Sequence, residues 1–446
     1  QRAPGSADPV NAEDVEGVVV SECRLQHRDR DVAADRAARA HEDRSARAHD
    51  KQRIEFLDAG AHIGRTGIKV QDARDGAFIG PEIPPDLQRQ WIQGTGPAAK
   101  PNAPLEKSIR NVAYALLSGA DGWMFDGEDA LGQIETMSLD NQRNLKLAIA
   151  RDPIFLKVAE QVAQEMNRWS QEFLGRPIID DSTRQLGFTT KIFRARGLHL
   201  DDRHIRMQGG DGFSASIVDI CLYVGNNYRA LRQSGASIVL YLPKIQTAEE
   251  AALWNDLLEA LERHLDLPVG TILAYVLIEQ LEASFQLMEV RAALGRHFVG
   301  FNTGRWDYIN SVADAMAWDP NFVNPNIDAI GMPYGYMRVY EDRVRRAVNT
   351  PDANGQFALW QGGMEPNIPV GSKTGVAASM EKTVAGAARE QQAGASGKWV
   401  AHWKMVHIVR PVWEQVGDNN QLGRRFEPLT YSPADADDLT LLEAAP

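Results

Sequence analysis

A repeating alternation of short apolar runs and longer helical patterns constrains this chain more than any other feature. The apolar runs are rich in β-branched and aromatic residues. Eight of them are candidate strands, at 120–126, 187–194, 236–244, 271–279, 297–302, 327–332, 357–363 and 398–403. Strands that are apolar almost throughout are typical of parallel sheets covered by helices on both faces. The pattern predicts an α/β fold in which a (β/α)8 TIM barrel is surrounded by helices.

A doubly wound open sheet is the alternative architecture. It is less favoured, because no Gly-rich phosphate-binding fingerprint follows any of the candidate strands. The clearest helix between strands covers 247–265. Thr247 and Glu250 form a capping box at its start, and apolar residues recur along one face at helical spacing. Residues 282–297 repeat this helical pattern before the next strand.

The chain divides into three segments by composition. We expect residues 1–107 to form an N-terminal helical arm or clasp with a connector, because 27–53 is a charged, Ala-rich run and 80–104 is rich in Pro and Gly. Residues 108–410 would form the catalytic barrel. Residues 411–446 would be a linker towards a C-terminal domain that is not present in this chain.

Charge and cysteine content exclude several classes of protein. The net charge of −12 and the pI of about 5.4 disfavour nucleic acid and anionic membranes as partners. No apolar run approaches the roughly 18 residues of a membrane span, and the first residues lack the apolar core of a signal peptide. The two cysteines, Cys23 and Cys221, do not form a disulfide framework. We therefore expect a cytoplasmic protein with small-molecule substrates, and leave a homo-oligomer open.

Charged residues follow the apolar runs, where the active site of a barrel is located. Glu279 ends one run and Asp307 follows the next, and their separation of 28 residues is one strand–helix–strand step. The two carboxylates should therefore lie on neighbouring strand ends. The first run adds three more acids at the same rim: Asp126, Glu128 and Asp129.

Two interpretations of these acids stay open on spacing alone. An oxygen-rich site of this kind suits Mg²⁺, and no Cys/His cluster offers a zinc or iron site instead. Alternatively, the acids are neutralised by arginines in a structural network of the rim, formed by Arg194, Arg196 and Arg305. Arg194 could also stabilise negative charge on an enolate or alkoxide.

Several longer strings resemble the malate synthase family, in its shorter, A-type branch. They are "RARGLHL", "SASIVDICLYVGNN", "YLPK", "GTILAYVLIEQLEASFQLMEV", "GFNTGRWDYI", "MFDGEDA" and "GASGKWVAHW". The resemblance covers about residues 108 to 435. It implies a (β/α)8 barrel with an N-terminal clasp and a C-terminal helical plug. It also implies a Mg²⁺-dependent acyltransferase of the glyoxylate bypass, which condenses acetyl-CoA with glyoxylate and hydrolyses the thioester to malate and CoA.

By this resemblance Glu279 and Asp307 are the Mg²⁺ ligands and Arg194 is the catalytic arginine that stabilises the enolate. The remaining residues carried over from the family would contact the substrate or metal-bound water: Asp126, Glu128, Asp129, Arg196, Gly304, Arg305 and Trp306. The acetyl-CoA cosubstrate would meet Lys244, Pro333 and Tyr334. His199 and His402 are expected to be hydrogen-bonded rim residues, not acid–base catalysts.

The chain also departs from the family pattern. Gly127 replaces a bulky residue, "GLHL" replaces a tryptophan-containing version, and "IEQ" replaces "IET". The family's catalytic base is an aspartate of a "MEDAAT"-like motif in the plug, and the sequence ends before such a motif. Alternatives to a malate synthase are therefore an acyl-CoA lyase of the malyl-CoA or citryl-CoA type and an inactive barrel with a role in assembly. Glu365, near the predicted rim, matches no family base.

Overall fold

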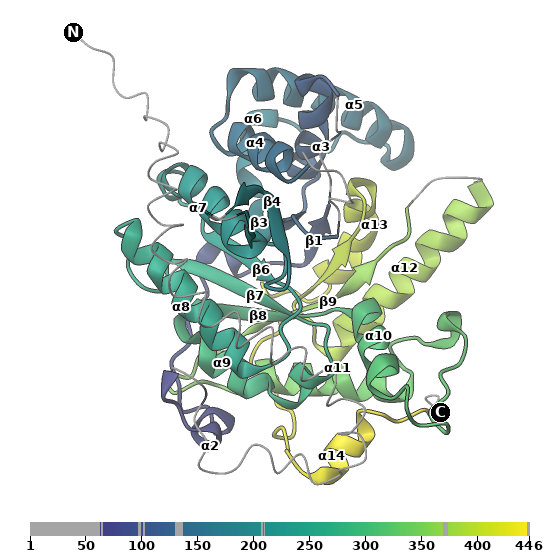
Figure 1. Cartoon of the computed structure of the whole chain (residues 1–446). Coiled ribbons are helices and arrows are strands. Elements are labelled where there is room, and N and C mark those ends of the chain that lie inside the picture. Colours follow the sequence, from purple (N-terminus) through teal and green to yellow (C-terminus); the bar gives the residue numbers. More distant parts are fainter. Residues whose placement is uncertain are drawn as a thin grey trace.

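The structure is a computed structural model that describes residues 63, 66–96, 100, 103–129, 137–206, 208, 210–368 and 373–443. The expected helix at 27–53 lies outside these residues. Eight parallel strands close into a barrel in the order β1-β10-β9-β8-β7-β6-β3-β2 (Figure 1). Their bounds are β1 Ile92–Thr95, β2 Gly122–Asp126, β3 Thr190–Arg194, β6 Ile238–Leu242, β7 Ile272–Ile278, β8 Phe298–Thr303, β9 Leu359–Glu365 and β10 Gly397–Val400. The predicted closed parallel barrel is confirmed.

Helices surround the barrel. They are α2 Val70–Arg74, α3 Leu105–Leu117, α4 Met137–Ile149, α5 Pro153–Leu174, α6 Ser182–Phe188, α7 Ala215–Gln233, α8 Ala248–His264, α9 Leu287–Leu294, α10 Arg305–Ala315, α11 Gly335–Val348, α12 Lys373–Ala393, α13 Trp403–Glu414 and α14 Pro433–Asp438. Short 3₁₀ turns lie at η3 Pro85–Leu87, η4 Glu282–Phe285, η5 Gly295–His297 and η6 Ile327–Ala329. Among the described residues, no helix is long and apolar enough to cross a membrane.

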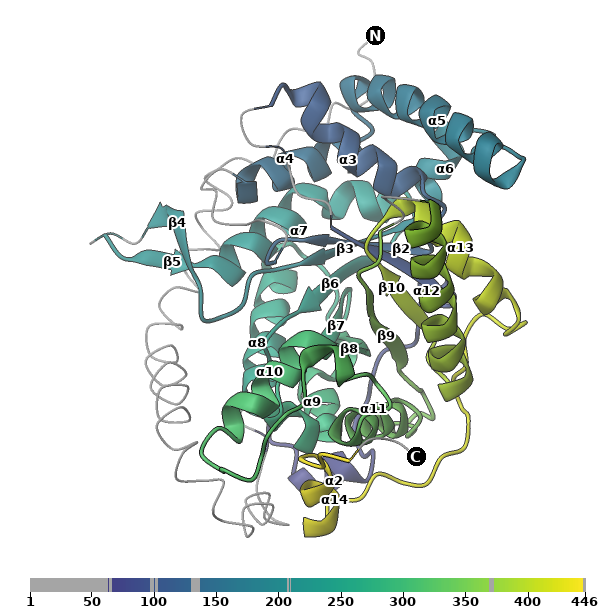
Figure 2. The ribbon, with the colours of Figure 1, turned by 90° about the vertical axis from the view of Figure 1, so that its right-hand side faces the viewer.

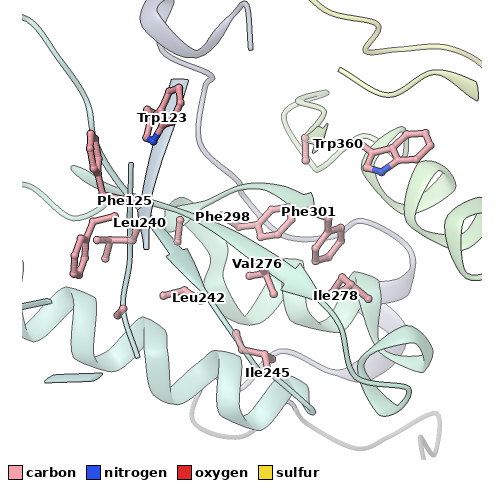
Figure 3. Close-up of a cluster of buried hydrophobic side chains, with 14 of the residues drawn as sticks. Trp123, Phe125, Leu240, Leu242, Ile245, Val276, Ile278, Phe298, Phe301 and Trp360 are labelled. Atoms are coloured by element: carbon pink, nitrogen blue, oxygen red, sulfur yellow. The ribbon is translucent and has the colours of Figure 1, made fainter. Parts of the chain in front are cut away.

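The alternation of side chains along each strand builds two separate cores. In β7, Ile272, Ala274, Val276 and Ile278 belong to the large cluster between the barrel and its helices, part of which Figure 3 shows. The intervening Leu273, Tyr275 and Leu277 belong to a smaller cluster inside the barrel. Because successive side chains of a strand point to opposite faces, a strand buried on both faces is apolar along most of its length. This explains why the strand signal in the sequence was so continuous.

One predicted strand is wrong. Residues 327–332 form η6 and a loop, and Ile327 is exposed. The eighth strand is instead β1, which lies in the stretch that we expected to be a connector. It pairs with both β10 and β2 and closes the barrel. Its sequence, "IQGT", lacks an apolar run, because Gln93 points into the interior and accepts hydrogen bonds from Tyr241 and Trp399.

The expected segment boundaries also change. Since β1 is a barrel strand, the barrel begins at Ile92 and not after residue 107. The boundary expected after residue 410 falls inside α13, which continues through Pro411 to Glu414. A two-stranded antiparallel hairpin, β4 Asp201–Arg206 and β5 Gly212–Ser214, projects from the barrel after β3 (Figure 2). The sequence pattern did not predict this hairpin.

Candidate active site

Charged side chains gather where the parallel strands end. Asp126 is the last residue of β2 and Arg194 the last of β3, and the two are paired in register. Glu279 directly follows β7, and Asp307 lies in the first turn of α10, which follows β8. Because β7 and β8 are neighbours in the barrel, the prediction that Glu279 and Asp307 lie on adjacent strand ends is confirmed.

Arg194 is held by three acids of the segment after β2. Its Nε and Nη2 donate to the two carboxylate oxygens of Asp126 at 2.7 and 2.5 Å, and Nη2 also donates to Asp129 at 2.7 Å. Its Nη1 lies 3.5 Å from Glu128 Oε2. Burial alone would lower the pKa of Arg194, but these carboxylates hold that pKa well above its usual value. The guanidinium is therefore a fixed, permanent positive charge in the mouth of the barrel.

The Lys244 side chain lies among acids of the segments that follow β2, β7 and β8. Its Nζ is 3.0 Å from Asp307 Oδ2, 3.2 Å from Glu279 Oε2 and 3.8 Å from Glu128 Oε1. Its backbone N–H donates to Glu279 Oε1 at 2.7 Å, and its φ of 57° is in the left-handed region. The network of acids and arginines that we considered as an alternative thus forms around Arg194, whereas a lysine contacts Glu279 and Asp307.

The three acids around Lys244 have altered pKa values. Burial raises the pKa of Glu279 to about 8 and that of Glu128 to about 7, in both cases against the effect of nearby cations. Burial would also raise the pKa of Asp307, but the hydrogen bond with Glu279 and the Lys244 ammonium together lower it. A cation placed beside a buried carboxyl group lowers its raised pKa, because the cation stabilises the ionised form of that group.

The donor set fits a small, hard cation. No cluster of three or more His, Cys, Asp or Glu side chains with metal-binding geometry occurs in the described part of the chain. Two carboxylates suffice for Mg²⁺, which keeps several waters and takes its remaining ligands from substrate. Glu279 and Asp307 already share one cation, the Lys244 ammonium, and the buried Glu128 Oε2 accepts no hydrogen bond from the residues that the structure describes. The oxygen ligands of Glu279 and Asp307 are harder than the His and Cys side chains that zinc and iron favour.

Two glycines allow the acids to approach. A Cβ on Gly304 would lie 2.7 Å from the Cβ of Glu279, so a larger residue there would displace this acid. A Cβ on Gly127 would lie 2.5 Å from the backbone oxygen of Arg194. The departure from the family pattern at Gly127 therefore has a local reason, since β2 and β3 lie too close at this point for a side chain.

Arg196 and Arg305 make contacts of a different kind. Arg196 donates to Asp219 of α7 and to Asp202 of the β4–β5 hairpin, at 2.6 to 2.9 Å. These bonds anchor the hairpin. Arg305 donates to the backbone oxygen of Ile330 at 2.7 Å and lies over the ring of Trp306. Neither arginine forms an ion pair with the acids of the mouth, and the substrate contacts expected of both stay predictions.

The other predicted residues differ in exposure and in their local contacts. Trp306 is 42% exposed, Pro333 is exposed, and Tyr334 is buried against Tyr336. His402 caps α13, because its Nδ1 accepts a hydrogen bond from the backbone of Lys404. Burial, aided by Lys404, lowers the pKa of His402 to about 4, and burial also lowers the pKa of His199. Both histidines are therefore neutral at pH 7.

Sequence reasoning missed Asp219 and the contacts that Lys244 makes with the carboxylate pair. Asp219 is a buried acid within the apolar run "SIVDICLYV", and this lone charge was a signal that a buried partner exists. Lys244 was expected to meet acetyl-CoA, which stays a prediction, and its contacts with Glu279 and Asp307 were not foreseen. Its position directly after a strand that neighbours β7 was the available signal for this contact.

A closed parallel barrel with an arginine–acid cluster and a carboxylate pair at its strand ends defines a protein of the TIM-barrel class with an acidic mouth. Known proteins agree with this class and narrow it. The family model described as "Malate synthase, TIM barrel domain" matches residues 190–439. This chain belongs to the malate synthase family.

Curated relatives resemble most of the chain. It is 33% identical over 371 residues to the bifunctional glyoxylate cycle protein of Caenorhabditis elegans. This aligned stretch covers 82% of this chain and 34% of the relative. It is 31% identical to malate synthase A of Escherichia coli, over 75% of this chain and 56% of the relative. It is also 31% identical to the malate synthase of Streptomyces clavuligerus, over 86% of this chain and 64% of the relative. The chain thus spans between about a third and two thirds of the length of these relatives.

Proposed function

We propose that this chain carries the catalytic barrel of a Mg²⁺-dependent malate synthase of the glyoxylate bypass. The reaction would condense acetyl-CoA with glyoxylate and hydrolyse the thioester to malate and CoA. One observation carries the proposal: a buried, fixed arginine and a pair of carboxylates lie at the same barrel mouth, in a chain of this family. The cytoplasm is the proposed location.

Glu279 and Asp307 would hold the cation. When bound, Mg²⁺ would act as a Lewis acid towards the aldehyde of glyoxylate. The carboxylate of glyoxylate would be met by the N-terminus of α10, which starts beside Asp307 and has no side-chain cap. Free backbone N–H groups at such a helix end favour an anion.

Arg194 would stabilise the enolate of acetyl-CoA. Removal of a proton from the acetyl group places negative charge on the thioester oxygen, and a guanidinium already oriented by Asp126 needs no rearrangement to meet it. Asp126, Glu128 and Asp129 would position Arg194 and metal-bound water. Pro333 and Tyr334 are proposed to border the CoA pocket.

The experiment measures free thiol released from acetyl-CoA in the presence of glyoxylate and Mg²⁺, with protein expressed from the complete reading frame. We expect Asp307→Asn to lower the rate at least about 100-fold, because the loss of a metal ligand removes several kcal/mol of transition-state stabilisation. Asp314→Asn is the matched control, since Asp314 is an exposed acid of the same helix. Its rate should equal that of the wild type.

Three outcomes would contradict the proposal. Equal rates for Asp307→Asn and the control would remove the assigned metal role. Cleavage of malyl-CoA without net thioester hydrolysis would instead identify an acyl-CoA lyase. Absence of Mg²⁺ and glyoxylate binding, measured by calorimetry, would indicate a barrel without catalytic activity.

A further inference from the structure

Lys244 occupies the place between Glu279 and Asp307 that a cation would take. Its ammonium lies 3.2 Å from Glu279 Oε2 and 3.0 Å from Asp307 Oδ2, within the range of direct ion pairs. Its backbone N–H donates to the same Glu279. The backbone of Lys244 adopts φ 57°, which is unfavourable for a residue with a side chain and persists only where surrounding contacts demand it. Main chain and side chain are therefore both directed at the carboxylate pair.

An ammonium and a divalent cation cannot both sit between these two carboxylates. We propose that Lys244 is the counter-ion of Glu279 and Asp307, that a divalent cation must displace it to bind between them, and that this competition sets the metal affinity. The proposal rests on the metal site of the proposed function. It adds that the Lys244 side chain limits the affinity of this site for metal.

Glu128 provides a second position for the displaced ammonium. Its Oε1 already lies 3.8 Å from Lys244 Nζ, and its buried Oε2 accepts no hydrogen bond from the described residues. Arg194 Nη1 lies 3.5 Å from this Oε2, but the hydrogen bonds of Arg194 go to Asp126 and Asp129, so Oε1 of Glu128 is left to Lys244. A short movement of Lys244 from Glu279 and Asp307 towards Glu128 would therefore free the pair for metal and keep the ammonium paired.

The test is the binding of Mn²⁺, followed by the electron paramagnetic resonance of the free ion, with Mg²⁺ calorimetry alongside. Lys244→Met removes the competing charge, and we expect it to bind Mn²⁺ about tenfold more tightly than the wild type. Lys157→Met is the matched control. It removes an ammonium that is paired with Glu106 at 3.3 Å on the outer helices, and it should bind Mn²⁺ as the wild type does.

A second variant guards against misfolding. Lys244→Gly also removes the ammonium, and glycine adopts a positive φ without strain, so this variant should fold and show the same gain. In the wild type, acylation of Lys244 by an N-hydroxysuccinimide ester, read by mass spectrometry, should accelerate several-fold when Mg²⁺ is added.

The possible failures can be told apart. If the wild type binds Mn²⁺ and the position 244 variants bind it equally or more weakly, displacement is refuted and the metal site stands. Unchanged acylation of Lys244 on adding Mg²⁺ refutes it as well. If neither the wild type nor any variant binds Mn²⁺ or Mg²⁺, the metal site of the proposed function is itself refuted.

Discussion

Arg194 and Asp126 bury opposite charges side by side at the ends of β3 and β2. The two residues are 4% and 5% exposed, and two hydrogen bonds join them. A buried charge is tolerated only when its partner remains, because the desolvation cost of each ion is offset by the other. This pair is therefore important for stability as well as for the proposed chemistry.

Asp126→Asn should destabilise the protein by about 3–5 kcal/mol, since it leaves the guanidinium in place without its main partner. Asn keeps the shape of Asp and can still accept the backbone hydrogen bonds of Glu128 and Asp129. The measurement is the free energy of unfolding in urea. Asp129→Asn is the control: its side chain is 60% exposed, and it should cost less than about 1 kcal/mol. Equal losses in both variants would refute the importance assigned to burial.

At the scale of an element, α8 illustrates how local sequence signals position the mouth. Thr247 Oγ1 accepts a hydrogen bond from the backbone of Glu250, as the capping box predicts. The Glu250 carboxylate accepts from the backbone of Gln246, in the loop that carries Lys244. The start of the helix is thereby tied to the loop at the end of β6. Burial raises the pKa of Glu250 to about 7.

This raised pKa predicts a pH dependence of stability. Between pH 4.5 and about 7, the folded protein binds more protons at Glu250 than the unfolded chain does, so the free energy of unfolding decreases as the pH rises through this window. Glu250→Gln is neutral at every pH and removes that part of the decrease. Its stability relative to the wild type should therefore improve from pH 4.5 to 7, as measured by urea unfolding at several pH values.

Glu249→Gln is the matched control for this experiment, because Glu249 is the exposed neighbour on the same helix turn. Its pH profile should run parallel to that of the wild type. A Glu250→Gln profile that also runs parallel would show that burial of this carboxyl does not contribute to the pH dependence.

At the scale of the whole molecule, the barrel closes where β1 meets β10. The strands approach so closely there that a Cβ on Gly397 would lie 1.8 Å from the backbone oxygen of Gln90. The backbone N–H of Lys398 donates to the oxygen of Trp91 at the same place. Closure of the barrel therefore depends on a residue without a side chain at position 397.

Gly397→Ala should cost about 3 kcal/mol or more, because backbone atoms, unlike the end of a flexible side chain, cannot move aside easily. Thermal and urea unfolding measure the loss. Gly225→Ala is the control: Gly225 lies in α7 with no atom within 4 Å of an added Cβ. Ala there should be neutral or stabilise the helix by up to about 1 kcal/mol. Similar stabilities of both variants would contradict the tight closure.

The sequence by itself determined the barrel, seven of its eight strands and the adjacency of Glu279 and Asp307. These features follow from local periodicity, because a strand buried on both faces is apolar along most of its length and one barrel step has a characteristic length. Periodicity did not predict β1, because this strand carries a polar residue inside the barrel. Gln93 is accommodated there by accepting hydrogen bonds from Tyr241 and Trp399.

Only the tertiary structure decided which charges meet. Arg194 pairs with Asp126, Arg196 with Asp219, and Lys244 with Glu279 and Asp307. Any of these cations could have met any of the acids as far as spacing along the chain indicates. The choice depends on distances of a few ångström between residues that are 23 to 68 positions apart, and the closed barrel sets those distances.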